Sequence, residues 1–586
     1  MKKYIYIIMC GVMSSMLIGC QDFLDVNTDP DTPITITLDQ AIPTACFYAS
    51  QLNYDHAEYG VYMCQALTTA GKSQTGSYPY SQGWEFLGVN RHPMWRRHFY
   101  DLGNNIAKMN EIAEAQGSLN YKLVGRTIML QSTMMTTDLF GDMPRSEAYL
   151  KSSPKYDSQE EVYEWLFEEA DQLVKDYEDP AWTKGVPIPV ASDRIYQGDL
   201  KKWAVYAKAL RCRLWLRKLP NWDNTPANCQ KIVQMVDEVL NDANWQEPRY
   251  NYPGGVTESN CPWGSTCPKI NSWESRDNRL ASSIPTAFFT KLLGAYTKYD
   301  GSYGYALDPR ADKMMTPRAM GSSSSSAAIR GLESNIGMDN SMKVTYYPDL
   351  YAGNGHNPFT QNTGYIALIT EEELLFIKAE AQYWAGDKTG AFNTTIQGVE
   401  RSMERYGVNY TTGIGQKLYE FFLKVKLPDA EHFTIADLMQ QKYVALYLQE
   451  EQWTDMRRYN YSSKTNGIFY DGVPVYTFKT RVGAKFTVEA FSGEYSLRRP
   501  YNLYAPYWDQ PDCYEDASKA VYSPNAWVNR LNPDTETETK YNKAELIRIG
   551  AANASGQVDY HWMQKHLIWA KFNPAVCTVS NSIEWK

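Results

Sequence analysis

The sequence lacks the short motifs that mark many hydrolases and nucleotide-dependent enzymes. Its 586 residues contain no HExxH zinc motif, no GxSxG nucleophile turn and no complete phosphate-binding loop. The 7 histidines are scattered and no CxxC pair occurs, so no metal-ligand set stands out. The sequence therefore predicts neither a cofactor nor a metal site. Catalysis by a pair of carboxylates that folding brings together is the one enzyme hypothesis left.

An excess of basic residues is also missing. There are 58 Lys and Arg against 67 Asp and Glu, a formal net charge of −9, which argues against nucleic acid as a partner. The hydrophobic fraction of 43% is enough for a sizeable core, so disorder is not the general state of the chain.

No apolar run reaches the length of a membrane span. The longest candidate, Tyr4 to Ile18, follows the basic pair Lys2-Lys3 and is shorter than the roughly 20 residues that a transmembrane helix needs. A basic start followed by a short apolar run is typical of a secretion signal. The alternative, a membrane anchor with a buried cysteine at its end, would need a longer run.

The end of this run, Leu17-Ile18-Gly19-Cys20, resembles a bacterial lipobox. The resemblance implies that residues 1–19 form a lipoprotein signal peptide and that Cys20 becomes the lipidated first residue, carrying acyl chains such as palmitate. Several acyl chains hold a protein at a membrane far better than one chain does. We expect the mature protein to be anchored to the membrane without spanning it.

Two of the 10 cysteines are close enough in sequence to form a local bridge. Cys261 and Cys267 flank a short stretch that contains Pro and Gly, and export makes disulfides possible. The alternative is that both are buried thiols. The sequence does not decide between these interpretations.

Helical periodicity is clearest in residues 95–240 and 365–460. Leu374, Ile377, Ala381 and Trp384 follow each other at intervals of three and four, which predicts one buried helix face. With the next helix, which we expect from about 391 to 406, they form a pair of tetratricopeptide size. One such unit cannot bury its own apolar face, so stacked pairs are expected.

Local signals add boundaries and surfaces to these helices. Ser158 with Glu161, and Thr434 with Asp437, have the spacing of capping boxes. We interpret the polar residues that lie off the apolar stripes as solvated faces with salt bridges. They are Arg211, Arg213, Arg217, Glu371 to Glu373, Glu450 and Glu451. Alternation from Phe469 to Val482 predicts a hairpin.

Two long segments without periodicity are rich in aromatic residues and amides. Aromatics make up 14% of the chain, with 44 Tyr and 17 Trp. In residues 71–92 and 245–281, rings that can stack on sugars lie near amides that can bond hydroxyl groups. The candidate ligand residues are Tyr78, Tyr80, Trp84, Trp263, Trp273 and Asn271. Alternatively, the tryptophans are loop anchors or core plugs.

Several blocks carry a resemblance to a known family. They are Phe140-Gly141-Asp142-Met143-Pro144, Ala379-Glu380-Ala381 before Gly386-Asp387, Gln441-Lys442-Tyr443, and Trp453-Thr454-Asp455-Met456-Arg457-Arg458. Together they resemble the SusD/RagB family of outer-membrane nutrient-binding lipoproteins. The resemblance implies a mainly α, SusD-like fold over residues 20–586, with tetratricopeptide-type helical pairs as the scaffold, long irregular loops and minor β structure.

The resemblance also implies a role without catalysis. Such a protein sits on the cell outer membrane facing the exterior, binds an oligosaccharide and delivers it to a SusC-like TonB-dependent transporter. RagB-like members are associated with peptide uptake, so a peptide is the alternative ligand. A structural subunit and a surface glycoside hydrolase are further alternatives. The six candidate ligand residues rest on composition and are not carried over from the family.

Overall fold

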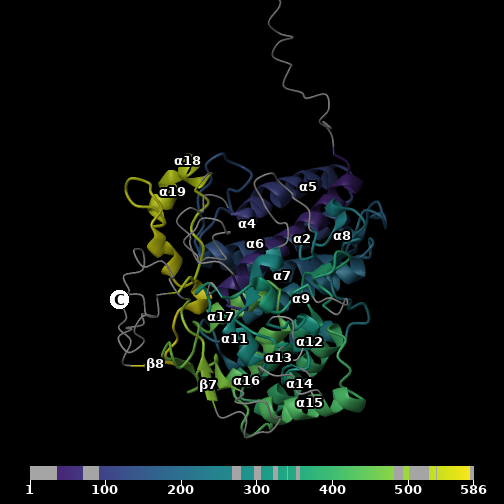
Figure 1. Cartoon of the computed structure of the whole chain (residues 1–586). Coiled ribbons are helices and arrows are strands. Elements are labelled where there is room, and N and C mark those ends of the chain that lie inside the picture. The colour runs from purple at the N-terminus through teal and green to yellow at the C-terminus, as the bar shows by residue number, and fades with distance from the viewer. Residues whose placement is uncertain are drawn as a thin grey trace, which may run out of the picture.

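A computed structural model describes residues 36–69, 92–266, 279–295, 305–320, 327–338, 341–351, 357–480, 493–500, 527–535 and 537–580. Helices dominate these ranges, and the expected mainly α architecture is confirmed (Figure 1). One main hydrophobic core includes residues from Leu38 to Cys577, so distant parts of the chain share it.

The first long helix is central to the fold. Helix α2 (Leu38–Met63) is buried at every position from Gln51 to Met63. A helix that is buried all round lies inside a protein rather than on its surface. Helix α2 packs against α5 (Asn105–Ala115), α6 (Leu119–Phe140) and α17 (Glu451–Arg458).

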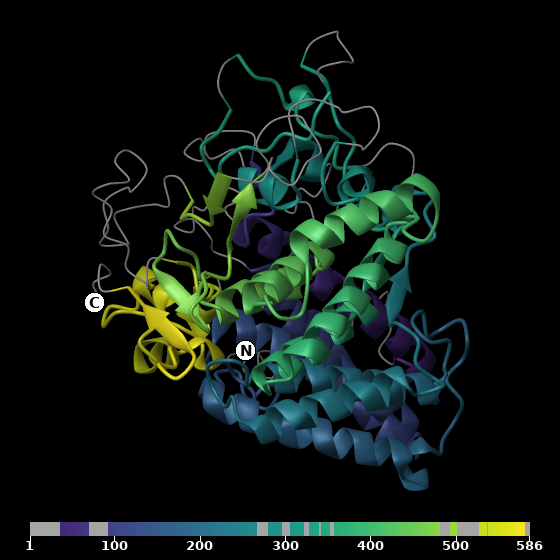
Figure 2. The same ribbon diagram turned by 90° about the horizontal axis from the view of Figure 1, so that it is seen from below.

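The other long helices form an array in which each packs on the next one in the chain. After α5 and α6, the order is α7 (Gln159–Glu178), α9 (Leu200–Leu216), α10 (Pro226–Leu240), α13 (Glu371–Trp384), α14 (Lys388–Arg405) and α16 (Ile435–Ala445). Figure 2 shows the green C-terminal helices lying against the blue and teal ones. The contact between α10 and α13 joins the two helical regions expected from periodicity.

Local signals explain where several of these helices begin and end. Ser158 and Thr434 both form the predicted capping boxes, at the starts of α7 and α16. Gly141 ends α6 with φ +80° and Gly386 follows α13 with φ +89°, a region that L-residues seldom adopt. Met143 and Pro144 then lead away from α6, as the sequence predicts.

The β structure is minor and consists of antiparallel pairs among the described residues. The pairs are β1 (Leu67–Thr69) with β3 (Ser283–Pro285), β2 (Arg249–Asn251) with β4 (Tyr365–Ala367), β5 (Ile468–Tyr470) with β8 (Cys577–Val579), and β6 (Thr477–Thr480) with β7 (Gly493–Ser496). Val482 lies outside the described residues. Within residues 469–480, the predicted hairpin is reduced to a tight turn in which Tyr470 and Val473 exchange two backbone hydrogen bonds, whereas β5 and β6 pair with other strands. Asp471 and Gly472, with φ +47° and +75°, turn the chain between them.

The remaining helices complete the description. They are α4 (Pro93–Arg96), the π-helix Arg97–Asn104, α8 (Pro180–Thr183), α11 (Ala287–Leu292), α12 (Ala311–Met314), α15 (Gly413–Lys426), α18 (Glu538–Tyr541) and α19 (Lys543–Arg548), with 3₁₀ turns at 257–259, 279–282, 344–346, 560–564 and 568–570. Within the ranges given above, no helix is long and apolar enough to cross a bilayer.

The C-terminal segment returns to the N-terminal helices. The backbone N–H of Leu531 donates to the carbonyl of Leu139 at 2.6 Å, and Trp569 Nε1 donates to Asp138 Oδ1 at 2.7 Å. Both views show this yellow segment beside the dark blue helices (Figures 1 and 2). Residues far apart in sequence therefore meet beside α4 and α6.

Candidate functional site

A large cavity lies where the C-terminal segment meets α4 and the π-helix. Its volume is about 550 Å³, within the range typical of small-molecule sites. We call it the aromatic cleft. Its lining residues are His92, Trp95, Arg96, Phe99, Tyr100, Asn104, Pro144, Ala148, Tyr149, Lys151, Pro154, Asp534, Thr537 and Glu538.

Aromatic rings form one wall of the aromatic cleft. The rings of Trp95 and Phe99 are 4.6 Å apart, and those of Phe99 and Tyr149 are 6.4 Å apart. Tyr100 is 62% exposed and Tyr149 is 42% exposed, unusually open for large rings. The guanidinium of Arg96 lies 5.0 Å from the ring centre of Tyr100. The wall offers flat, half-polar faces to a ligand.

Two backbone features of this wall are rare. The eight residues Arg97–Asn104 form a π-helix, a structure frequently found at functional sites. Tyr149 has φ +66°, a conformation that is uncommon and strained for a bulky non-glycine residue. A Cβ on Gly103 would lie only 1.7 Å from the Tyr149 hydroxyl, so this glycine makes room for the tyrosine. The loop of Tyr149 thus packs on the π-helix at Gly103 and at Phe99.

Polar groups lie opposite the rings. The backbone N–H of His92 donates to Asp534 Oδ2 at 3.0 Å, and Tyr156 donates its hydroxyl proton to Glu538 Oε2 at 2.7 Å. Burial lowers the pKa of His92 to about 4, although Asp534 opposes the shift, so the imidazole is neutral at pH 7. Burial also raises the pKa of Glu538. These four side chains form hydrogen bonds, but no nucleophile among them contacts a general base.

Strand pairing brings together described residues that flank the two segments singled out by the sequence as ligand loops. Thr69, the last residue before residues 70–91, is paired with Ser283, which follows residues 267–278 and the turn 279–282. The next described residue is His92, which lines the aromatic cleft. Five of the six candidate ligand residues lie outside the described residues, as do Cys20 and Cys267. These five are Tyr78, Tyr80, Trp84, Trp273 and Asn271.

The sixth candidate, Trp263, lies in the core. It is 1% exposed, and its ring packs edge to face on Tyr54 with centroids 4.8 Å apart. This placement corresponds to the alternative interpretation, a core plug beneath the loop, since no face of the indole is open to a ligand. Cys261 is buried as well, and because Cys267 lies beyond the described ranges, the bridge between them stays a prediction.

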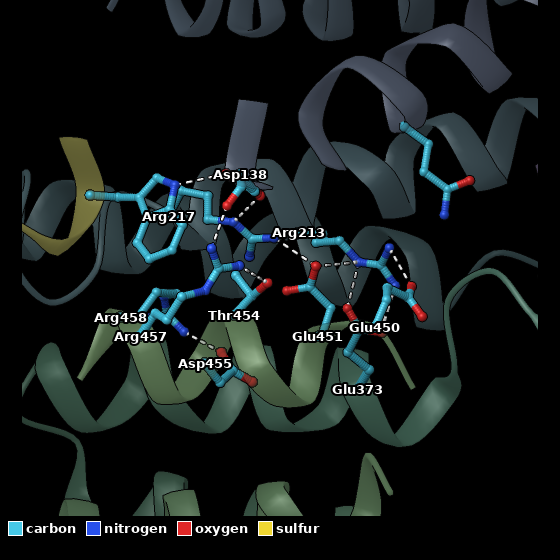
Figure 3. Close-up of polar contacts among 12 residues, drawn as sticks. Asp138, Arg213, Arg217, Glu373, Glu450, Glu451, Thr454, Asp455, Arg457 and Arg458 are labelled. Atoms are coloured by element: carbon cyan, nitrogen blue, oxygen red, sulfur yellow. Dashed lines mark hydrogen bonds and ion pairs between the residues drawn. The ribbon is translucent and has the colours of Figure 1, made fainter. Parts of the chain in front are cut away.

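A buried ionic network joins α6, α9, α13 and α17, and Figure 3 shows it. Arg213 pairs with Glu373 at 2.7 Å and with Glu450 at 2.9 Å. Arg217 pairs with Asp138 at 3.0 Å and with Glu451 at 2.6 Å. The side chains of Arg213 and Arg217 are both 0% exposed.

This network corrects the interpretation of these residues as solvated faces. Arg213, Arg217, Glu372, Glu373, Glu450 and Glu451 are all buried. Arg211 alone among the three arginines stays at the rim, with 15% of its side chain exposed. The prediction was wrong because each arginine finds its acids on other helices, and no single helix pattern reveals a distant partner.

The pKa values of Glu450 and Glu451, at the start of α17, are shifted in opposite directions. Burial raises the pKa of Glu450 to about 8, and Arg213 offsets only part of this shift. Burial acts on Glu451 in the same direction, but Arg217 and Arg213 outweigh it and lower the pKa to about 2. Perturbed carboxyls can mark catalytic sites, but these are enclosed by arginines and do not line the aromatic cleft. We assign them to stability.

Comparison with known proteins agrees with the motifs found in the sequence. Residues 44–469 match the SusD-like family model described as "Starch-binding associating with outer membrane". The chain belongs to this SusD-like family. SusD-like proteins are non-catalytic binding proteins associated with the outer membrane, so the expectation of binding without catalysis is confirmed by family membership.

Solved structures show the same fold over most of the chain. A SusD homologue from Bacteroides uniformis is 16% identical, with a TM-score of 0.59 over 91% of this chain and 99% of its own. A chitin-binding SusD homologue from Flavobacterium johnsoniae is 15% identical, with a TM-score of 0.56 over 92% and 97%. A SusD/RagB family protein from Bacteroides thetaiotaomicron is 17% identical, with a TM-score of 0.52 over 73% and 88%. No curated protein sequence matches this SusD-like chain.

Sequence reasoning missed the aromatic cleft. Trp95, Phe99 and Tyr100 fall within a predicted helix, and Tyr149 belongs to no motif. One signal was available in the sequence, since a content of 44 tyrosines indicates a surface that offers half-polar rings for binding. The meeting of residues 92–104 with residues 534–538 could not be read from local patterns.

Proposed function

We propose that this SusD-like protein captures an oligosaccharide in the aromatic cleft and delivers it to a SusC-like TonB-dependent transporter. The observation that carries the proposal is the cleft itself, with Tyr100 and Tyr149 exposed beside Trp95 and Phe99. Sugar rings present apolar faces to aromatic side chains, while their hydroxyl groups need hydrogen-bond partners. Asn104, an exposed residue of the cleft lining, is such a partner.

The neighbouring loops extend the proposed site. We assign Tyr78, Tyr80, Trp84, Trp273 and Asn271 to further ligand contacts, supported by the β1–β3 pairing that joins the ends of their segments. Lipidation at Cys20 anchors the protein at the outer membrane, facing the exterior. Because no catalytic group is needed, the ligand leaves the site unchanged.

A peptide is the second candidate ligand, and one observation favours it. Leu150, adjacent in sequence to Tyr149, is 77% exposed. An open aliphatic side chain contributes little to sugar binding but can cover an apolar side chain of a peptide. Arg96 and Lys151, both exposed in the cleft lining, can pair with a carboxylate of a peptide.

The test is calorimetric titration of the purified chain with a panel of oligosaccharides and peptides, with mass analysis of each ligand afterwards. We expect an intact oligosaccharide to bind saturably. Tyr100→Ala and Tyr149→Ala should each weaken it about 2- to 10-fold, the loss expected for one stacking ring. Tyr541→Ala is the matched control, since Tyr541 is 68% exposed but does not line the cleft.

Other outcomes discriminate among the alternatives. Binding of peptides alone would replace the oligosaccharide with the second candidate. Equal losses in all three variants would show that the cleft is not the site. A cleaved ligand would contradict binding without catalysis. Delivery is tested separately, by whether the Tyr100→Ala variant lowers uptake of the same ligand by cells that keep the transporter.

A further inference from the structure

A second cavity lies far from the aromatic cleft. It has a volume of about 440 Å³ and lies between the end of α15, the start of α16 and the strand β6. In Figure 1, α4 and α18, which border the aromatic cleft, are in the upper part of the molecule, whereas α15 and α16 are at the bottom. We call this second cavity the lysine pocket.

Three lysines line the lysine pocket, Lys424, Lys426 and Lys479. Within the described ranges, none of them forms an ion pair or hydrogen bond through its ammonium group. Most lysines near an acid in this protein are paired, as Lys464 is with Glu494 at 2.8 Å. Three lysines and one carboxylate, Asp437, therefore line the pocket, so positive charge is in excess here.

The acids and the histidine near the lysine pocket are already engaged. Asp437 accepts hydrogen bonds from Thr434 N at 2.9 Å and Thr434 Oγ1 at 2.7 Å, as part of the capping box. His432 lines the pocket and pairs with Asp429 at 2.8 Å. The first turn of α16 adds the partial positive charge of a helix N-terminus. The pocket is thus electropositive overall.

Lys426 is the least hydrated of the three lysines. Its Nζ lies 5.5 Å from the ring centre of Phe478, which is 7% exposed. Burial lowers the pKa of Lys426 to about 8, and Asp308 and Asp437 offset this only in part. Asp308 is already held by Arg310 at 2.7 Å. A bound anion would restore the charge balance that the protein does not provide.

The other lining groups favour a ligand that also carries hydroxyl groups. The side-chain amide nitrogen of Gln440 donates to the carbonyls of Val475 at 2.8 Å and Thr477 at 3.2 Å. Its amide oxygen accepts no hydrogen bond from a described residue, so it can accept one from a ligand hydroxyl. The volume is also much larger than a bare ion needs.

We propose that the lysine pocket binds an acidic sugar, with the carboxylate of the sugar between Lys426 and its neighbouring lysines and a sugar hydroxyl on Gln440. The three cations, the free amide oxygen and the size of the pocket together select this class of ligand. The site is independent of the aromatic cleft and takes its ligand whether or not the cleft binds an oligosaccharide.

The test uses glucuronate, glucose and sulfate as probes in calorimetric titrations of the full chain at pH 7 and constant ionic strength. We expect glucuronate to bind at least about tenfold tighter than either glucose or sulfate, because only glucuronate satisfies both the lysines and Gln440. Equal affinity for glucose would overturn the anion site. Equal affinity for sulfate would overturn the assignment to a sugar.

Variants then locate the binding. Lys426→Met should weaken glucuronate about tenfold or more, whereas Lys417→Met, an exposed lysine on α15 outside the pocket, should leave the affinity unchanged. Lys479→Met is a second pocket variant at an exposed position, useful if the half-buried Lys426 proves necessary for folding. Equal affinities in Lys426→Met, Lys479→Met and Lys417→Met would overturn the proposal.

The cleft variant separates this proposal from the first one. Tyr100→Ala should leave glucuronate affinity unchanged, because Tyr100 lines only the aromatic cleft. Loss of glucuronate binding in Tyr100→Ala, with binding kept in Lys426→Met, would assign the acidic sugar to the cleft and overturn the lysine pocket. Loss of oligosaccharide binding in Tyr100→Ala alone concerns the proposed function and not this site.

Discussion

At the level of single residues, the buried arginines explain how four helices stay in register. Arg213 lies on α9, and its acids lie on α13 and next to α17. A buried ion pair adds little when it replaces well-packed apolar groups, but removing one partner leaves an uncompensated charge. The network therefore mainly destabilises arrangements in which these helices pack wrongly and leave a buried charge unpaired.

Arg213→Met should lower the free energy of unfolding by about 3–5 kcal/mol, because Glu373, which is buried, then loses its partner. Arg211→Met, two residues earlier at the rim, should cost at most about 1 kcal/mol, since its partners Asp171 and Glu238 are 40% and 43% exposed. Denaturant unfolding of both variants gives the comparison. Equal costs would show that burial of the pair is irrelevant.

At the level of elements, sequence patterns predict the features that depend on residues close together in the chain, such as helix caps and turns. The capping boxes of Ser158 and Thr434 and the turn at Gly141 are visible because each involves residues within a few positions of one another. Trp263 shows the limit of this reasoning. A tryptophan in an aromatic-rich segment can be either a ligand contact or a buried core residue. Only the packing of Tyr54 on the ring of Trp263 distinguishes the two.

The aromatic cleft shows the same limit at a functional site. Three separate segments, residues 92–104, 144–154 and 534–538, supply its walls. Each segment has an ordinary local pattern, so their proximity depends on how the C-terminal segment packs against α4 and α6. The helical periodicity of residues 97–104 does not distinguish a π-helix from an α-helix, and the strain at Tyr149 is visible only in its backbone angle.

The fit between the π-helix and the loop of Tyr149 is testable. Gly103→Ala places a methyl group where the Tyr149 hydroxyl lies, so the ring must move and ligand affinity should fall about as far as in Tyr149→Ala. In the Tyr149→Ala background, the same glycine substitution should have little further effect. Calorimetric titration of the three variants completes the cycle. Additive losses would show that Gly103 acts independently of Tyr149.

For the whole molecule, buried ionisable groups set the pH at which the fold is most stable. Burial lowers the pKa of His56 and His98 to about 3 and that of His92 to about 4. Histidine in the unfolded chain titrates near pH 6.5, so below that pH the unfolded chain binds more protons than the folded chain. The free energy of unfolding therefore decreases as the pH is lowered. This loss continues until the folded pKa values near 3 to 4 are reached.

One buried acid, Glu450, lowers the free energy of unfolding as the pH rises toward 8. Because burial raises the pKa of Glu450 to about 8, its proton is kept in the folded chain but lost from the unfolded chain above about 4.3. This contribution is complete below about pH 4.3 and is lost as pH rises through 8. Between pH 4.3 and 6.5 it opposes the three histidines but is outnumbered by them.

The free energy of unfolding should therefore be greatest near pH 6.5, with a steep acid side from the histidines and a shallow decline toward pH 8 from Glu450. Each proton contributes at most about 1.4 kcal/mol per pH unit, so three histidines outweigh one carboxyl on the acid side. Denaturant unfolding between pH 4 and 8 measures the curve. Glu450→Gln removes the titrating proton while keeping the shape of the side chain, and should flatten the decline from 6.5 to 8. The assignment of that decline to Glu450 fails if it persists in Glu450→Gln.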